Sequence, residues 1–248
     1  GSVGVSNEED VEANVEAVLR EFLDESETYQ QFVAADEALQ DDDDAMALLD
    51  YYRNNESDYG TRRHAFLELA WFTGARQGGI NALDIRDCHF GENPYVEFRH
   101  RPDSGTPLKN KLGGERPVAI TRETADVLQA YIDGPRYDVR DDHGRQPLIS
   151  SAKGRPHTNT LRVISYLATI PCLHSPCPHG KEEIACNWTE YAHASKCPSS
   201  RSPHQIRTGA VTWLLNKGWP PEDVAERVNA SVKTIEQHYD KADPEERR

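Results

Sequence analysis

Acidic residues are concentrated at one end of this 248-residue chain, and this limits which part of it folds around a core. Residues 1–58 hold 18 Asp and Glu against two Arg, whereas residues 59–248 hold 24 acidic and 26 basic residues. We therefore expect residues 1–44 to form an acidic helical arm or linker and residues 45–248 to form one folded domain. No run of about 18 apolar residues and no secretory signal is present, so we expect a cytoplasmic protein outside the membrane.

The hydrophobic pattern predicts a mostly helical α+β fold. Alternating apolar and polar residues predict strands at 94–100 and 116–120, joined by a turn-rich basic connector, as in a small antiparallel hairpin or three-stranded sheet. Apolar residues at helical spacing predict helices at 11–23, 45–52, 64–73, 121–132, 158–170 and 204–216, with two short helices after 220 and 231. A Cys-rich insert at 172–197 separates the last three helices from the rest.

Four residues in three segments are the groups that transfer a phosphodiester without a metal. His204 and Arg207 lie three apart at the start of a predicted helix, so they share one face near a helix N-terminus, where an anion is favoured. Arg76 lies in the turn TGARQGG, and Tyr239 follows a short predicted helix in SVKTIEQHYD. Arginine forks bind phosphate oxygens and neutralise charge that develops on phosphorus, while a tyrosine is a covalent nucleophile.

These segments resemble the catalytic, DNA breaking–rejoining domain of the tyrosine recombinase (phage integrase) family. TGARQGG resembles the motif that carries the family's first arginine, and HQIRTGA resembles its HxxR box. NKLGGERPVAI resembles the hairpin that carries the general-acid lysine. ERVNASVKTIEQHYD resembles the segment that ends at the nucleophilic tyrosine. The resemblance covers roughly residues 45 to 243. It implies a site-specific recombinase or integrase that binds double-stranded DNA, self-associates on it as a synaptic tetramer, and needs no cofactor for catalysis.

The resemblance also implies a role for each catalytic residue. Arg76 and Arg207 hold the scissile phosphate, and Tyr239 attacks it to give a 3′-phosphotyrosine. His204 assists by accepting a proton or by a hydrogen bond to the phosphate. Lys111 protonates the departing 5′ oxygen. Lys109, two residues earlier and expected on the same strand face, is the alternative general acid.

The sequence departs from the family pattern in two places. Val228, Asn229 and Ala230 stand where the family usually has Leu-Gly-His, and Gly78-Gly79 occupies a stretch that usually holds an acidic residue. These departures leave open a non-catalytic DNA-binding regulatory protein on the same fold, and a type IB topoisomerase shares the chemistry. The arm of 44 residues is too short for a complete core-binding domain of the usual size, so we interpret it as a remnant of one.

The insert contains four of the five cysteines. Four thiolates within 26 residues favour a structural zinc ion over disulfides in an intracellular protein, with His174 and His179 as competing ligands. Unliganded thiols and disulfides are the alternatives. Cys88 stands apart and is expected to be an inert buried thiol. The expected zinc ligands are Cys172, Cys177, Cys186 and Cys197.

Basic residues give two further predictions. The segment SAKGRPHTNTLRVI opens a predicted helix, and its side chains are either DNA-backbone contacts or a solvated face; the candidates are Lys153, Arg155, Thr158 and Arg162. Only eight of the 28 basic residues are Lys, and many acids with few Lys indicate a halophilic organism. At molar salt the Debye length is about 3 Å, so repulsion between an acidic chain and DNA is largely screened. An acidic arm on an ordinary protein explains the same composition.

Overall fold

The computed structural model describes residues 44–239, and side chains for residues 45–236. These residues belong to one compact unit, 41–248. The predicted acidic arm, including its helix at 11–23, lies outside the described residues. None of the helices in the described part is long and apolar enough to cross a bilayer.

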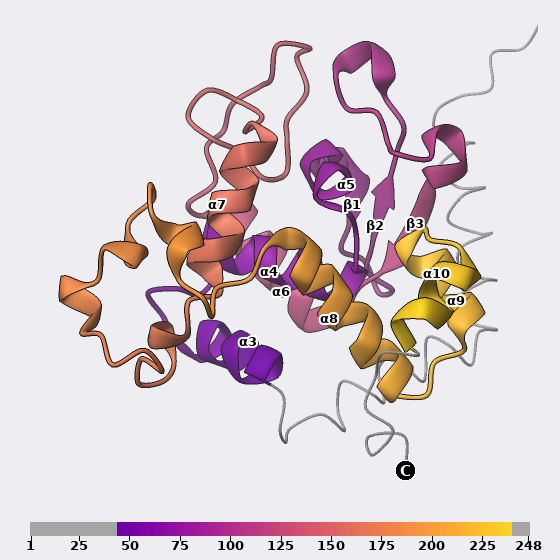
Figure 1. Cartoon of the computed structure of the whole chain (residues 1–248). Coiled ribbons are helices and arrows are strands. Elements are labelled where there is room, and N and C mark those ends of the chain that lie inside the picture. The colour runs from indigo at the N-terminus through magenta and orange to yellow at the C-terminus, as the bar shows by residue number, and fades with distance from the viewer. Residues whose placement is uncertain (1–43, 240–248) are drawn as a thin grey trace, which may run out of the picture. The chain divides into compact units, whose positions relative to one another are not determined.

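The described residues form an α+β domain in which helices surround one small sheet, as predicted (Figure 1). The sheet is antiparallel, in the order β1-β2-β3, and its strands are Cys88–His89, Tyr95–Phe98 and Arg116–Ala119. The helices are α3 (Asp44–Asn54), α4 (Arg62–Thr73), α5 (Gln77–Ala82), α6 (Arg122–Asp133), α7 (Thr158–Ala168), α8 (Pro203–Asn216), α9 (Pro221–Val228) and α10 (Val232–Tyr239).

Helix α4 is the centre of the helical part, since α6, α7 and α8 all pack against it. It begins at the N-cap Thr61, whose side chain accepts a hydrogen bond from the His64 backbone, and it ends at Gly74 with a φ of 55°. A side chain at Gly74 would be strained by this φ, and its Cβ would lie 2.7 Å from Val228 Cγ1. Gly74 therefore lets the end of α9 approach the end of α4.

A buried carboxylate joins three helices of the core. Glu68 of α4 is fully buried and accepts hydrogen bonds from Arg53 of α3 (2.8 Å to Nε) and Thr124 of α6 (2.8 Å). His64 Nε2 lies 3.3 Å from the same carboxylate. Burial alone would raise the pKa of Glu68, but the hydrogen bond with His64 and the ion pair with Arg53 outweigh it and hold this pKa below its ordinary value.

A second buried cluster, the Asp84 cluster, fastens the connectors around the sheet. Asp84 is 1% exposed and pairs with Arg155, and its other oxygen lies 3.5 Å from Arg101 and 3.6 Å from Arg145. Asp141 pairs with Arg155 at 2.9 Å and with Arg145 at 3.3 Å. Asp87 pairs with Arg101 at 2.5 Å, so the three arginines face three carboxylates within the fold.

The connector between β2 and β3 does not place Lys109 and Lys111 on one strand face, contrary to the expectation from the sequence. Strand pairing stops at Phe98 and Arg116, so neither lysine of this connector lies in a strand. Lys111 instead begins a 3-10 turn, Lys111–Gly114, with a φ of 51°. Two glycines inside the turn and Pro107 before it disfavour a continued ladder. Lys109 and Lys111 therefore do not share a strand face.

Candidate active site

Arg76 is placed by the sharp connection between α4 and α5. It is the N-cap residue of α5, and its backbone carbonyl begins that short helix. Its side chain turns toward the other end of the chain, where Nη1 donates to the backbone oxygen of Asn229 at 2.7 Å. Burial lowers the pKa of the Arg76 guanidinium. The first predicted arginine therefore contacts the α9–α10 turn, 153 residues away in sequence.

Arg207 reaches the same place from the first turns of α8. That helix begins as predicted, at Pro203 behind a capping box in which Ser202 and Gln205 bond to each other's backbone. Arg207 Nη1 donates to the backbone oxygens of Gly74 and Val228, the latter at 2.7 Å. These oxygens lie at the C-terminal ends of α4 and α9, where a cation is favoured. Burial lowers the pKa of Arg207 to about 10, and repulsion from Arg76 and Arg116 adds to this.

Arg116 is a third arginine at this site, and sequence reasoning missed it. It opens β3, lies 4.6 Å from the centre of the Phe98 ring, and donates to the backbone oxygens of Arg227 (2.7 Å) and Gly114 (2.9 Å). Burial lowers its pKa to about 10, with Arg76 adding repulsion. Its position within the quoted hairpin motif, at the start of the predicted strand 116–120, was the available signal.

Arg76, Arg116 and Arg207, here called the arginine cluster, repel one another without a counter-ion of their own. None of the three pairs with a carboxylate in the described part of the chain, in contrast to the arginines of the Asp84 cluster. Their hydrogen bonds go to backbone oxygens. Half-buried cations that lack an acidic partner are stabilised by an external anion. The arrangement is suited to a phosphate.

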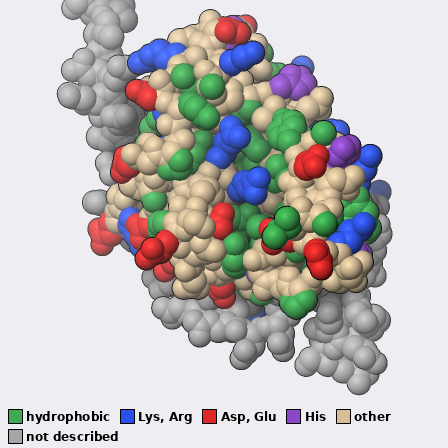
Figure 2. All heavy atoms as spheres, turned by 90° about the vertical axis from the view of Figure 1, so that its left-hand side faces the viewer, with side chains coloured by type: hydrophobic (Ala, Val, Ile, Leu, Met, Phe, Trp, Pro, Cys, Tyr) green, Lys and Arg blue, Asp and Glu red, His purple; other side chains and the backbone are tan. Residues whose placement is uncertain are grey.

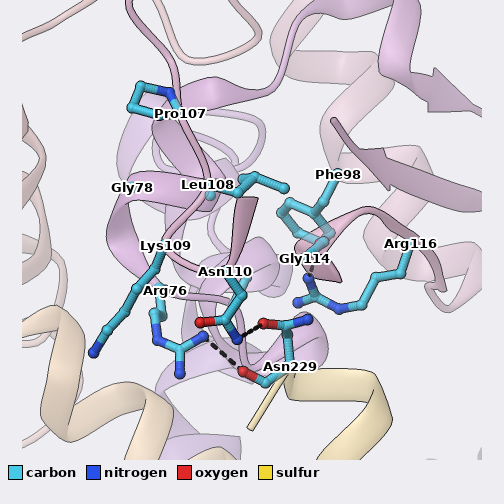
Figure 3. A pocket seen from close by; sticks show the side chains of 12 residues that line it. Arg76, Gly78, Phe98, Pro107, Leu108, Lys109, Asn110, Gly114, Arg116 and Asn229 are labelled. Carbon is cyan, nitrogen blue, oxygen red and sulfur yellow. Dashed lines mark hydrogen bonds between the residues drawn. The ribbon is translucent and has the colours of Figure 1, made fainter. Parts of the chain in front are cut away.

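A pocket of about 240 Å³ adjoins the arginine cluster (Figure 3). Arg76, Lys109, Arg116 and Asn229 contribute polar groups to its wall, and Gly78 and Gly79 form part of its lining. Figure 3 shows Arg76 and Lys109 among the side chains that line the pocket. Lys109 lines the pocket, whereas Lys111 is exposed at the start of the 3-10 turn and is not part of the lining.

The histidine and the tyrosine expected at this site are less closely defined. His204 is exposed in the first turn of α8, one turn before Arg207, so the predicted shared face is present. Tyr239 is the last residue of α10, a helix that packs against α8 and α9. Its side chain lies outside the described residues. The structure thus brings Arg76 and Arg207 together and places α10, which ends at Tyr239, against the helix that carries Arg207.

The phage integrase family model matches residues 40–246 of this chain, which include all the elements of the site. The chain belongs to the phage integrase family. No curated protein sequence matches it significantly. Its fold resembles several solved tyrosine recombinases. XerA recombinase has a TM-score of 0.56 and 20% identity over 83% of this chain.

Two DNA complexes share the fold of this integrase-family chain. The Tn1549 transposon integrase bound to transposon right end DNA has a TM-score of 0.54 and 18% identity over 81% of this chain. XerH recombinase in a post-cleavage complex with palindromic difH substrate has a TM-score of 0.52 and 18% identity over 80% of this chain. The aligned region covers 59% of the XerA chain, 60% of the Tn1549 integrase chain and 48% of the XerH chain.

The predicted DNA contacts divide into two groups. Lys153, Thr158 and Arg162 are exposed around the start of α7, and Gln77, next to Arg76, donates to the Thr158 backbone oxygen. The expectation for Arg155 needs correction, because its guanidinium is held by Asp84 of the Asp84 cluster and by neighbouring backbone oxygens. Only 10% of its side chain is exposed, so it fastens loops within the fold.

The cysteine insert consists of short 3-10 turns, from Pro171–Leu173 to Ala194–Lys196. Its thiols are unpaired, and no group of three or more Cys, His, Asp or Glu is arranged to hold a metal in the described part of the chain. Burial raises the pKa of Cys172, with smaller contributions from Glu183, Cys177 and Cys197. Viewed from the side of the insert, basic and acidic side chains are interspersed (Figure 2).

Proposed function

We propose that this chain cleaves and rejoins DNA as a site-specific tyrosine recombinase, through a 3′-phosphotyrosine intermediate. The observation that carries the proposal is the arginine cluster, in which three guanidinium groups converge beside a pocket without a carboxylate partner among the described residues. DNA is the proposed partner, and solved recombinases with this fold are bound to DNA. Self-association on DNA as a synaptic tetramer is part of the proposal.

The chemistry follows from the arginine cluster and from the groups that line the adjoining pocket. Arg76 and Arg207 donate hydrogen bonds to the two non-bridging oxygens of the scissile phosphate. Because Nη1 of Arg207 donates to backbone oxygens, its Nε and Nη2 are the groups that bind the phosphate. Arg116 adds a third positive charge near the phosphate. As negative charge grows on the phosphorane, these fixed cations stabilise it without rearrangement.

Covalent transfer then proceeds in two reversible halves. The Tyr239 oxygen attacks phosphorus, the bond from phosphorus to the 5′ oxygen breaks, and a lysine gives its proton to that oxygen. His204 assists by taking the tyrosine proton or by a hydrogen bond to the phosphate. Lys109 lines the pocket and is the lysine that the geometry favours, while Lys111 is the one that the resemblance implies. Rejoining reverses each step, so neither ATP nor a catalytic metal is consumed.

A nicked-substrate experiment tests this proposal. In a randomised duplex library with staggered nicks, cleavage near a nick releases a short fragment and traps the enzyme on DNA. Wild-type protein should give a DNA adduct that survives denaturing electrophoresis. Tyr239→Phe should bind the library equally well and give no adduct, because only the hydroxyl is lost.

Two other outcomes decide between functions. An adduct that persists with Tyr239→Phe would remove this residue as nucleophile. Selective DNA binding by the wild type with no adduct on any substrate would favour the regulatory DNA-binding protein, the alternative that Ala230 in place of the usual histidine supports. Relaxation of supercoiled plasmid without site preference would indicate a topoisomerase instead.

A further inference from the structure

Asn229 stands in the stretch where the family usually has Leu-Gly-His, and it occupies a central position at the pocket. It ends α9 in the left-handed conformation, with φ 52° and ψ 63°, and its backbone N–H donates to the carbonyls of the last turn. Its own backbone oxygen accepts the hydrogen bond from Arg76. The main chain of Asn229 therefore holds one arginine of the cluster.

The side chain of Asn229 holds a different segment, the connector between β2 and β3. Its Oδ1 accepts from Asn110 Nδ2, and its Nδ2 donates to the Gly113 backbone oxygen at 2.8 Å. Figure 3 shows the contacts with Asn110 and Arg76. One amide group thus bonds to the side chain of Asn110, which lies between Lys109 and Lys111, and to the backbone of Gly113.

The backbone of this connector is unusual in a way that needs such support. Among the described residues, Lys111 and Asn229 are the non-glycine residues with positive φ. A lysine rarely adopts this conformation, and it persists where the surroundings impose it. Residues 109–113, here called the lysine turn, are exposed, so packing contributes little to their placement. The two hydrogen bonds of Asn229 lie on either side of Lys111.

We propose that Asn229 is a positioning residue, which holds the lysine turn against the arginine cluster so that a lysine reaches the departing 5′ oxygen. This inference rests on the proposed recombinase function. It assigns to Asn229 a task that differs from the direct phosphate contact of the missing histidine, since both ends of its amide are already bound to the lysine turn.

A substrate with sulfur in place of the bridging 5′ oxygen tests the inference, because a thiolate leaves without a proton. Asn229→Gly removes the amide and keeps the left-handed backbone that glycine adopts freely. On ordinary DNA its single-turnover cleavage rate should fall on the order of 10²-fold, the usual contribution of a general acid. On the sulfur-containing DNA its rate should return to that of the wild type.

Asn110→Ala is the second variant, since it removes the partner from an exposed position without changing α9. It should show the same rescue, while Leu112→Ala, in the same turn and 72% exposed, should cleave both substrates normally. Equal loss on both substrates, or no loss on either, for Asn229→Gly would overturn the inference. Wild-type protein that forms no adduct on either substrate would overturn the proposed function itself.

Discussion

Substitutions of Arg207 should show separately how this side chain contributes to the stability of the fold and to the rate of DNA cleavage. Arg207→Ala leaves the backbone oxygens of Gly74 and Val228 without their donor. Two hydrogen bonds to a charged group contribute about 3–6 kcal/mol together. Loss of repulsion within the arginine cluster offsets part of this, so we expect a net loss of about 2–4 kcal/mol. In a domain of this size the melting temperature should fall by roughly 5–15 °C.

Arg207→Lys should give a different result. Lysine keeps a cation at the ends of α4 and α9, so the melting temperature should fall by only a few degrees, roughly the effect of 1 kcal/mol. It lacks the planar fork, so single-turnover adduct formation should fall on the order of 10²-fold or more. Thermal melting by circular dichroism and adduct formation on nicked DNA measure the two effects.

The matched control is Arg86→Lys, on a side chain that is 64% exposed and lies 3.4 Å from Asp84, a pairing that a lysine can keep. It should change neither the melting temperature nor the cleavage rate. Two results would refute the reasoning: near-normal cleavage by Arg207→Lys, or a melting temperature for Arg207→Ala equal to that of the wild type. The first would remove the bidentate contact with phosphate. The second would show that the two helix ends do not depend on Arg207.

Three further outcomes are expected. Sulfur-containing DNA should rescue Lys109→Ala more than Lys111→Ala, and rescue of Lys111→Ala alone would return the general-acid role to that lysine. If the insert cysteines bind structural zinc, purified protein should contain about one zinc per chain and chelation should lower its melting temperature; metal-free protein of unchanged stability would refute this. Because the pKa of Glu68 is lowered by folding, its stabilising contribution is present above about pH 4.5 and is lost as the pH falls through the lowered value. Glu68→Gln should therefore flatten acid denaturation followed by circular dichroism, and an unchanged acid midpoint would contradict the assignment.

Features that depend on neighbouring residues could be predicted from the sequence. The start of α8 and the shared face of His204 and Arg207 follow from local spacing and capping chemistry. The small antiparallel sheet followed from alternation of residue types. The turn-rich connector was predicted too, but the expected shared strand face of Lys109 and Lys111 was wrong, because strand pairing ends at Phe98 and Arg116.

Features that depend on distant contacts could not be predicted in this way. Asn229 meets Asn110 across 119 residues, and Arg116 meets Arg227 across 111 residues. Arg155 looked like a DNA contact in its basic surroundings, and its actual partner Asp84 lies 71 residues earlier. Local sequence shows that a side chain is charged, but not which distant group it pairs with.

The contrast between the Asp84 cluster and the arginine cluster has a consequence for how charge should be counted in acidic proteins that handle nucleic acids. A formal net charge of −14 is a sum over the whole chain and does not distinguish charges that cancel from charges that do not. Here carboxylates pair with one set of arginines, while another set, as far as the structure describes the chain, bonds to backbone oxygens. The close-range attraction between the protein and a polyanion such as DNA is set by the charges of the arginine cluster. A strongly acidic protein can therefore present a locally cationic surface without a basic patch in its sequence.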